Sequence, residues 1–343
     1  MRTARLAIVG LGNVGRRLLE LIELKQELLH ERYDLELVVA GAVDTSGGAV
    51  ADQGGLDLSQ VLQLKRDKQG VAAYPKVGIR GMTPQQLVRA ANADILVELS
   101  LTNVKDGEPG LSTIRGALTR QMNVVTANKG PLVLEFQELM ALARENRVRL
   151  LHSATVTGGL PTLNLGMRDL GATVIDKFEG VVNGTTNYIL SRMTEGQSYE
   201  DALKHAQDIG MAEADPTLDV DGWDAANKLV IIANAVLHRP TKLSDLTVEG
   251  IRGVSPDELR DATERRNVVK LVALAEKAGK DYRLSVAPTH LDTTHPLADV
   301  GAGMMGVIYH TDINGSIIAK IEEHDPYPTA AGVLRDIIQV ATS

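Results

Sequence analysis

The sequence predicts an α/β protein with two domains. Over the first 151 residues, short apolar runs of the kind found in buried strands alternate with helical patterns, which is typical of a doubly wound sheet. The chain then becomes rich in turns before further strand-like runs appear. Its 343 residues, 44% of them apolar, are enough for two cores. We therefore expect one domain at residues 1–151, completed by a C-terminal helix at 327–343, and a second α/β domain at 152–326.

Composition excludes several classes of protein. The net charge of −8 and the lack of a basic run argue against a nucleic-acid surface. Because there is no apolar span of membrane length and no signal peptide, we expect a cytoplasmic protein that binds neither nucleic acid nor membrane. The chain has no cysteine, which excludes disulfides, thiolate metal sites and dehydrogenases that form a thiohemiacetal with their aldehyde.

A glycine motif follows the first predicted strand. Residues 5–9 form a short apolar run, and the motif at 10–15 leads from it into a helical pattern over residues 16–29. In this context G-x-G-x-x-G lets the backbone approach a diphosphate, whose charge the helix N-terminus stabilises. The alternative is a tight turn of an α/β protein. We expect a Rossmann domain whose coenzyme-binding residues include Gly10, Gly12, Asn13, Val14 and Gly15.

Asp44 ends the second predicted strand, at residues 35–43. A carboxylate there can accept hydrogen bonds from the adenosine ribose hydroxyls, and it would repel the 2′-phosphate of NADP. No arginine follows directly, although Lys65 or Arg66 could fold back to hold a phosphate. Asp44 could alternatively cap a turn. We therefore predict a preference for NAD, with NADP as a possible second coenzyme.

The rest of the first domain continues the alternation. We expect helices at 58–66, 111–120 and 132–146, and strands near Val71 and at 95–97, 123–126 and 148–151. Lys129 follows the strand at 123–126, and ligands in such folds collect at the carboxyl ends of strands. We therefore weigh a role for Lys129 at the coenzyme or substrate against that of a solvated lysine in a turn.

The second domain begins after a turn-rich hinge at 154–161. We expect helices at 162–170, 188–194, 223–237 and 255–277, strands at 177–182, 282–287, 306–311 and 316–321, and a terminal helix at 329–341 capped by Thr329. The helix at 223–237 is apolar almost all round, so it should be buried.

Asp224 and Lys228 lie four residues apart on this helix, and therefore on one face. Four more acids precede them in the loop at 213–221, and Asp221 or Gly222 can cap the helix. A surface ion pair is the plain alternative, but so apolar a helix has little surface. An acid and a lysine buried beside acidic residues suggest a polar substrate site.

Five blocks of sequence together resemble the homoserine dehydrogenase family, and in the family's order. They are G-L-G-N-V-G at 10–15, A-N-K-G-P at 127–131, A-T-V-T-G-G-L-P at 154–161, N-G-T-T-N-Y-I-L at 183–190 and E-A-D-P with D-x-D-G-x-D-A-x-x-K at 213–228. The resemblance implies hydride transfer between NAD(P)H and L-aspartate 4-semialdehyde, giving L-homoserine in threonine and methionine biosynthesis. It also implies a homodimer formed by the second domain, and strands near Val181 would leave an apolar sheet face exposed on a lone subunit.

The resemblance assigns roles to residues at the matching positions. It implies that Lys228 is the proton donor, with Lys129 as its partner at the coenzyme, and that Glu213 and Asp224 bind the substrate's amino group. Further substrate contacts would come from Asn183, Thr185 and Gly210, and Ser100 would lie on the nicotinamide side. The carbonyl groups of Ser153, Val156, Gly158 and Leu160 match a family site for a monovalent cation such as sodium, but the family's usual acid is Ser153 here.

Two departures from the family pattern affect the C-terminal part. The family's G-P-G-A-G stretch before the terminal helix is replaced by residues 322–330, and Gly301-Ala-Gly303 lies about 25 residues too early to substitute for it. The sequence stops at the terminal helix, so we expect no appended regulatory domain and no threonine inhibition through one.

Two other functions remain open from the sequence. A sister dehydrogenase for another amino-acid-like alcohol or aldehyde would explain the altered C-terminal stretch. A non-catalytic NAD-binding sensor is the alternative from another class, although Lys129 and Lys228 argue against it. Phosphorylating aspartate-semialdehyde dehydrogenase is excluded because the chain has no cysteine.

Overall fold

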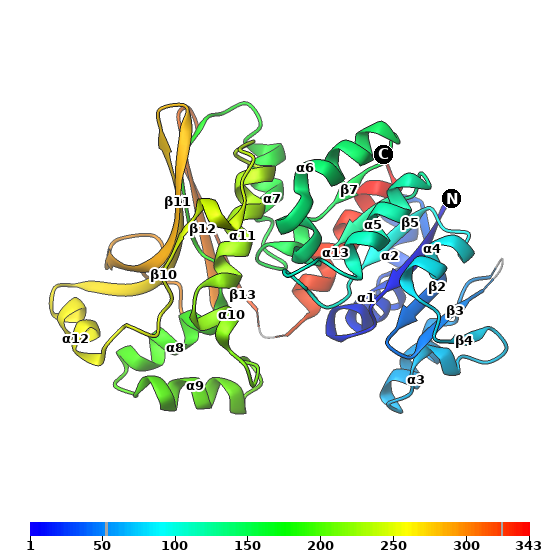
Figure 1. Cartoon of the computed structure of the whole chain (residues 1–343), viewed down its shortest axis with the longest axis horizontal. Coiled ribbons are helices and arrows are strands. Elements are labelled where there is room, and N and C mark those ends of the chain that lie inside the picture. Colours follow the sequence, from blue (N-terminus) through cyan, green and yellow to red (C-terminus); the bar gives the residue numbers. More distant parts are fainter. Residues whose placement is uncertain (52–53, 324) are drawn as a thin grey trace. The chain divides into compact units, whose positions relative to one another are not determined.

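The computed structural model describes residues 1–51, 54–323 and 325–343. The chain divides into two compact units, Met1–Gly159 with Asp325–Ser343, and Leu160–His324 (Figure 1). Residues 152–159, which we expected in the second domain, thus belong to the first unit. None of the described helices is long and apolar enough to cross a membrane.

The first unit contains a seven-stranded sheet in the order β4-β3-β2-β1-β5-β6-β7. The five strands from β2 to β7 run parallel, and β3 and β4 add an antiparallel edge. Its strands are β1 (Arg2–Val9), β2 (Leu35–Asp44), β3 (Gly47–Val50), β4 (Gly78–Arg80), β5 (Ile95–Glu98), β6 (Asn123–Thr126) and β7 (Leu150–Leu151). Its helices are α1 (Asn13–Leu24), α2 (Gln26–Tyr33), α3 (Leu58–Arg66), α4 (Pro84–Ala90), α5 (Gly110–Thr119), α6 (Lys129–Glu145) and α13 (Tyr327–Ala341).

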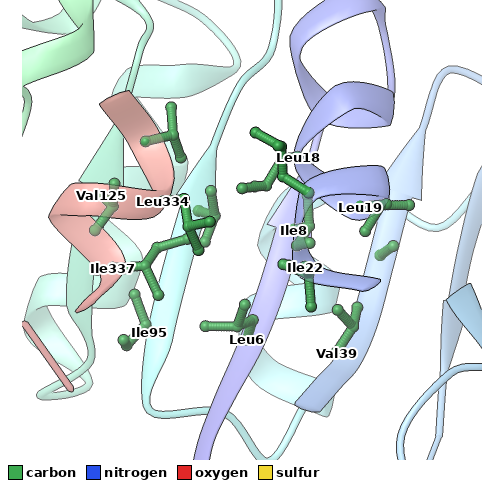
Figure 2. Packing of buried hydrophobic residues seen from close by; sticks show 14 of the residues in the cluster. Leu6, Ile8, Leu18, Leu19, Ile22, Val39, Ile95, Val125, Leu334 and Ile337 are labelled. Atoms are coloured by element: carbon green, nitrogen blue, oxygen red, sulfur yellow. The ribbon is translucent and has the colours of Figure 1, made fainter. Parts of the chain in front are cut away.

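Helices α1 and α13, from opposite ends of the chain, pack side by side on one face of this sheet (Figure 1). Figure 2 shows their leucines and isoleucines against the apolar side chains of β1, β2, β5 and β6. Alternate strand residues such as Leu96 and Val124 are also fully buried, and α5 contacts the same two strands. Both faces are thus covered, as the apolar runs predicted, and the expected α/β class with a Rossmann domain is confirmed.

The second unit is built on a six-stranded sheet in the order β13-β12-β8-β10-β11-β9, antiparallel except for the β11–β9 pair. Its strands are β8 (Ile175–Val181), β9 (Thr247–Val248), β10 (Asn267–Ala278), β11 (Asp281–Asp292), β12 (Met304–Thr311) and β13 (Gly315–Glu322). Its helices are α7 (Thr162–Asn164), which continues as a π-helical turn at Leu165–Asp169, α8 (Gly184–Thr194), α9 (Tyr199–Asp208), α10 (Thr217–Val220), α11 (Trp223–Ala235) and α12 (Pro256–Glu264). Helices α8 and α11 both contact the central strand β10.

The expected helix over residues 255–277 is wrong. Helix α12 ends at Glu264, and Arg266 has a left-handed backbone with φ of 58°. The chain then continues as the twelve-residue strand β10, which pairs with β8 on one side and β11 on the other. The leucines, alanines and lysines of β10 favour a helix, but its valines and its central place in the sheet outweigh that preference.

Smaller differences lie at the ends of elements. The helix expected at 16–29 breaks at Lys25 into α1 and α2, and the strand expected near Val71 is a 3₁₀ turn at Val71–Ala73. Thr329 does not cap the terminal helix, which begins at Tyr327 after Pro326.

Candidate active site

The glycine loop joins β1 to α1, and two of its glycines are required by the chain itself. Gly10 has φ of 91°, and a Cβ there would lie 2.4 Å from the carbonyl oxygen of Leu99. A Cβ on Gly15 would lie 2.2 Å from the carbonyl oxygen of Gly10. Gly12 differs, because a Cβ there would meet nothing within 4 Å. Gly12 is also the N-cap of α1 and supplies no side-chain cap, so open space remains where the first amides of the helix need an acceptor. A diphosphate fits this arrangement.

The carboxyl ends of β5 and β6 carry a buried hydrogen-bond network. Both the amide and the hydroxyl of Ser100 donate to the Glu98 carboxylate, and the Asn128 amide donates to the Ser100 hydroxyl at 3.2 Å. Glu98 is fully buried, and this burial raises its pKa against the opposing effect of the Ser100 hydrogen bonds. Asn128 also caps α6 by accepting from the Gly130 amide at 3.0 Å. Lys129, half-buried, is the first residue of that helix.

The strand order changes direction at β1: the chain adds β2 on one side of it and later adds β5 on the other side. Ligands of open α/β sheets bind at such a point, beyond the carboxyl ends of the strands. The glycine loop, Ser100 and Lys129 all lie at these ends. Glu98 and Asn128 were not predicted as site residues, although an acid and an amide at the ends of two apolar strands indicate such a site.

Asp44 is more fully bonded than we expected. One of its carboxylate oxygens accepts from the amide and hydroxyl of Ser46, at 2.9 and 2.6 Å. The other accepts from Lys65 Nζ at 2.6 Å and the Val71 amide at 3.2 Å. Burial alone would raise the pKa of Asp44, but the hydrogen bonds from Lys65 and Ser46 outweigh it and hold the pKa below its ordinary value. Asp44 thus bonds the turn that follows β2, which is the capping alternative named above, and Lys65 is the residue of α3 that reaches it. Its contact with the adenosine ribose stays a prediction.

Lys228 lies in the second unit, one turn along α11 from Asp224. Its Nζ donates to Asp224 at 2.7 Å and to the carbonyl oxygen of Val182 at 2.5 Å. The side chains are only 11% and 16% exposed, so the alternative of a surface ion pair is wrong. An ammonium has three donors, and these two bonds leave one N–H for another acceptor.

Asn183 connects Lys228's neighbours to the start of α8. Its amide donates to Asp219 at 2.7 Å and to Asp224 at 2.9 Å, while its oxygen caps α8 by accepting from the Thr186 amide at 2.8 Å. Both amide hydrogens are thereby used, and Asn183 holds two carboxylates in place. Asp219, which the sequence analysis did not single out, joins the site through this bond.

Thr185 is in the first turn of α8, and its hydroxyl donates to the carbonyl oxygen of Met211 at 3.1 Å. The first amides of any α-helix lack acceptors within the helix, so those of Gly184 and Thr185 are donors available to an anion. Carboxylates, an ammonium and helix-terminal amides thus converge within the second unit. We call this group of residues, Asn183–Thr185, Met211, Asp219, Asp224 and Lys228, the lysine site.

Gly210 and Glu213 lie on the segment that leads from α9 to α10, beside Met211. The Gly210 amide donates to the carbonyl oxygen of Gln207 at 3.0 Å and so completes the end of α9. The Glu213 side chain is exposed, and its backbone carbonyl accepts from the Gln207 amide at 3.1 Å. Within the described part of the chain, neither residue hydrogen-bonds to the Lys228 ammonium.

The residues matched to the family's cation site form another network. Ser153 donates from its amide and hydroxyl to Asp336 of α13, at 2.8 and 2.7 Å. Burial raises the pKa of Asp336, which the Ser153 bonds oppose. A carboxylate of α13 therefore lies next to Ser153, the position at which the family usually has an acidic residue. Val156 and Gly158 belong to the first unit and Leu160 begins the second. In the described residues no group of three or more histidine, aspartate or glutamate side chains could hold a metal.

A Rossmann sheet with a glycine loop, and a second unit with a buried lysine among carboxylates, define a nicotinamide-dependent dehydrogenase of small polar substrates. Comparisons with known proteins agree. The family model described as homoserine dehydrogenase matches residues 161–338. A homoserine dehydrogenase of Methanocaldococcus jannaschii is 34% identical over 98% of each chain. An NAD(+)-dependent homoserine dehydrogenase of Pseudomonas canavaninivorans is 34% identical over 100% of this chain and 97% of its own.

Solved structures show the same likeness. A hyperthermophilic archaeal homoserine dehydrogenase in complex with NADPH has a TM-score of 0.86 and 30% identity, over 98% of this chain and 97% of its own. The crystal structure of homoserine dehydrogenase from Thermoplasma acidophilum has a TM-score of 0.85 and 27% identity over all of both chains. The chain therefore belongs to the homoserine dehydrogenase family, which consists of NAD(P)-dependent oxidoreductases.

Proposed function

We propose that the chain interconverts L-homoserine and L-aspartate 4-semialdehyde, with Lys228 as the acid and base of the reaction. The observation that carries this proposal is the hydrogen bonding of Lys228. Its buried ammonium is oriented by Asp224 and the Val182 carbonyl, and one N–H remains to meet the reacting oxygen.

The chemistry requires one proton for each hydride. When bound, the nicotinamide coenzyme supplies the hydride to the aldehyde or accepts it from the alcohol. In reduction Lys228 donates a proton to the oxygen that gains negative charge, and in oxidation it takes the proton from the hydroxyl. Asp224 accepts a hydrogen bond from the ammonium at 2.7 Å and fixes its direction.

The lysine site also suits the amino-acid end of the substrate. The α-carboxylate can accept from the Gly184 and Thr185 amides at the start of α8. Asp219 and Asp224, which Asn183 holds in place, provide negative charge for the ammonium. We propose that the exposed carboxylate of Glu213 contributes further negative charge. In the first unit, Ser100 and Lys129 lie at the strand ends where the nicotinamide would bind. We propose that Glu98 and Asn128 position them.

The proposal is tested by oxidation of L-homoserine, followed by NAD(P)H absorbance, with L-serine and other amino alcohols as controls. We expect saturable turnover with L-homoserine and much less with the controls. Faster turnover of another amino alcohol would favour the sister dehydrogenase, and coenzyme binding without any turnover would favour the sensor.

We further propose that NAD is preferred over NADP, by a margin that the Asp44–Lys65 pair sets. A 2′-phosphate at this strand end would meet Lys65, which now lies 2.6 Å from Asp44, as well as the repelling carboxylate. Lys65 therefore offsets part of the discrimination that an unpaired Asp44 would give. The name of the Pseudomonas relative as NAD(+)-dependent supports the preference, while the archaeal NADPH complex shows that the other coenzyme binds a related protein.

Opposite shifts are expected from the two members of this pair. Lys65→Ala should lower kcat/KM for NADP roughly 10–100-fold more than for NAD, because the phosphate loses its cation. Asp44→Asn should shift the ratio toward NADP. The control is Arg66→Ala, which changes the exposed neighbour of Lys65 on α3. It should leave the ratio of kcat/KM for NADP to kcat/KM for NAD unchanged. If Lys65→Ala changed kcat/KM equally for both coenzymes, the Asp44–Lys65 pair would not determine the preference between NAD and NADP.

We also propose a homodimer, on different grounds from those expected. Val181 is only 1% exposed, because Leu297, Val300 and Ile308 of its own chain cover it, so the sequence-based reason was wrong. Strand β13 instead ends the sheet, and its Ile318 is 45% exposed. An apolar edge strand favours pairing with a second copy. Light scattering at micromolar concentration should give about twice 36.8 kDa, and Ile318→Lys should reduce it. Particles of one chain mass in the native protein would contradict this proposal.

For the cation, we propose that Asp336 supplies the missing carboxylate near Ser153. Sodium would then bind this carboxylate together with carbonyl groups of the same unit, those of Val156 and Gly158. Activity that depends on sodium and loses this dependence in Asp336→Asn would support the assignment, and equal activity with and without sodium would remove it.

A further inference from the structure

A buried lysine outside the proposed mechanism holds a loop of the second unit. Lys270 lies on β10 and is only 6% exposed, yet its Nζ bonds two neutral oxygens. It donates to the Asn187 side chain at 2.8 Å and to the Val300 carbonyl at 2.7 Å. Burial lowers the pKa of Lys270 to about 8, so the ammonium is still mostly charged at neutral pH. Asp299, at the same loop, is a nearby negative charge.

Asn187 connects this lysine to the rest of the loop. It is fully buried on α8, and its amide donates to the carbonyl oxygens of Val300, Gly301 and Met304, at 3.2, 2.5 and 3.2 Å. One amide and one ammonium therefore hold three carbonyl groups of a five-residue segment, the 300–304 loop. Burying a cation without a direct carboxylate partner is costly, which suggests that the position of this loop matters.

The tip of the 300–304 loop lies against the lysine site. Gly303 has φ of 77°, and a Cβ there would be 3.5 Å from the Met211 methyl group. Its carbonyl oxygen would be 3.8 Å from a Cβ on Gly184. Gly184 supplies a first-turn amide of α8, and the Met211 carbonyl accepts the Thr185 hydroxyl. The loop thus borders the group that we assign to the substrate's carboxylate.

We propose that Lys270 and Asn187 are positioning residues, which fix the 300–304 loop as one wall of the substrate site and so set the affinity for the amino-acid end of homoserine. This inference rests on the proposed function, because it takes the lysine site as the substrate site. It also assigns a role to Gly301-Ala-Gly303, which lies too early to replace the family's C-terminal glycine motif. This stretch forms part of the 300–304 loop.

The test compares Lys270→Met with Lys277→Met, a matched change at the half-exposed end of the same strand. Methionine keeps the length of the side chain and removes the donors. In Lys270→Met we expect KM for L-homoserine to rise roughly tenfold or more, with kcat within about threefold and coenzyme affinity unchanged. Hydrogen exchange of the unliganded enzyme should become faster at residues 300–305 only. Lys277→Met should match the native enzyme in every respect.

Other outcomes would overturn the proposal. Faster exchange of the loop with an unchanged KM would show that the loop is not a wall of the substrate site. Equal losses in kcat, coenzyme affinity and thermal stability would reduce Lys270 to a structural role. If Lys270→Met does not fold, Gly303→Ala provides the same comparison, since its left-handed backbone disfavours a side chain and only the loop is disturbed. If the native enzyme did not oxidise homoserine, the proposed function would be refuted. Hydrogen exchange would still show whether Lys270 holds the 300–304 loop in place.

Discussion

Lys228→Met is expected to lower kcat for L-homoserine oxidation roughly 10²–10⁴-fold, the usual contribution of a positioned acid or base. Methionine approximates the volume of the lysine inside the buried helix α11, so packing is preserved. Asp224 keeps its hydrogen bond from Asn183, which limits the cost of removing its cation. Coenzyme affinity should be unchanged, because the glycine loop and Asp44 belong to the other unit.

The matched control is Lys204→Met, which changes an exposed lysine of α9 in the same unit. It should retain native kcat and KM. Thermal melting and coenzyme titration of both variants separate loss of chemistry from loss of fold. Near-native kcat in a folded Lys228→Met enzyme would remove Lys228 from the mechanism.

Gly12→Ala is expected to weaken coenzyme binding by at least ~10-fold, or about 1.4 kcal/mol, without destabilising the protein. Its φ of −76° is accessible to alanine, and a Cβ meets nothing of the chain within 4 Å. The free energy of unfolding should therefore stay the same or rise by about 0.4–1 kcal/mol, because alanine has less freedom in the unfolded chain. The methyl group would instead occupy the space in which the diphosphate approaches the helix.

Gly116→Ala on α5 is a control of the same kind, since a Cβ there also meets nothing within 4 Å. It should leave coenzyme affinity unchanged. Titration of NADH fluorescence and thermal melting measure the two quantities for each variant. Native coenzyme affinity in Gly12→Ala would place the diphosphate elsewhere, whereas a large fall in melting temperature would mean that Gly12 serves the fold.

The first unit was largely predictable because its strands are apolar on both faces and its helices carry clear ends. The expected bounds of α3, residues 58–66, are those observed, since Asp57 caps the helix and Asp67 follows it. Strand β6 was also placed correctly, at Asn123–Thr126. In contrast, β10 is a half-polar strand made of residues that favour helices, and only its pairing with β8 and β11 determines its structure. Such non-local pairing leaves little trace in a single sequence.

The lysine site was predictable where its geometry is local. Asp224 and Lys228 are one helical turn apart, so their contact followed from the spacing alone. The bond from Asn183 to Asp219 joins residues 36 positions apart, and Lys65 reaches Asp44 across 21 positions. These contacts depend on how α8 packs beside α10 and how α3 packs beside the end of β2. Side-chain bonds of this kind occupy the acceptors of Asp44 and the donors of Asn183, which changes the roles expected of both residues.

The central claim is direct hydride transfer between a nicotinamide coenzyme and the C4 carbon of the substrate. The most direct measurement is mass spectrometry of the product formed from L-aspartate 4-semialdehyde and NADH carrying two deuterium atoms at C4 of the nicotinamide. Two deuterium atoms make the result independent of the face from which the hydride leaves. We predict L-homoserine heavier by one mass unit, with the deuterium on C4. Unlabelled homoserine, or no homoserine from an enzyme that binds the coenzyme, would contradict it.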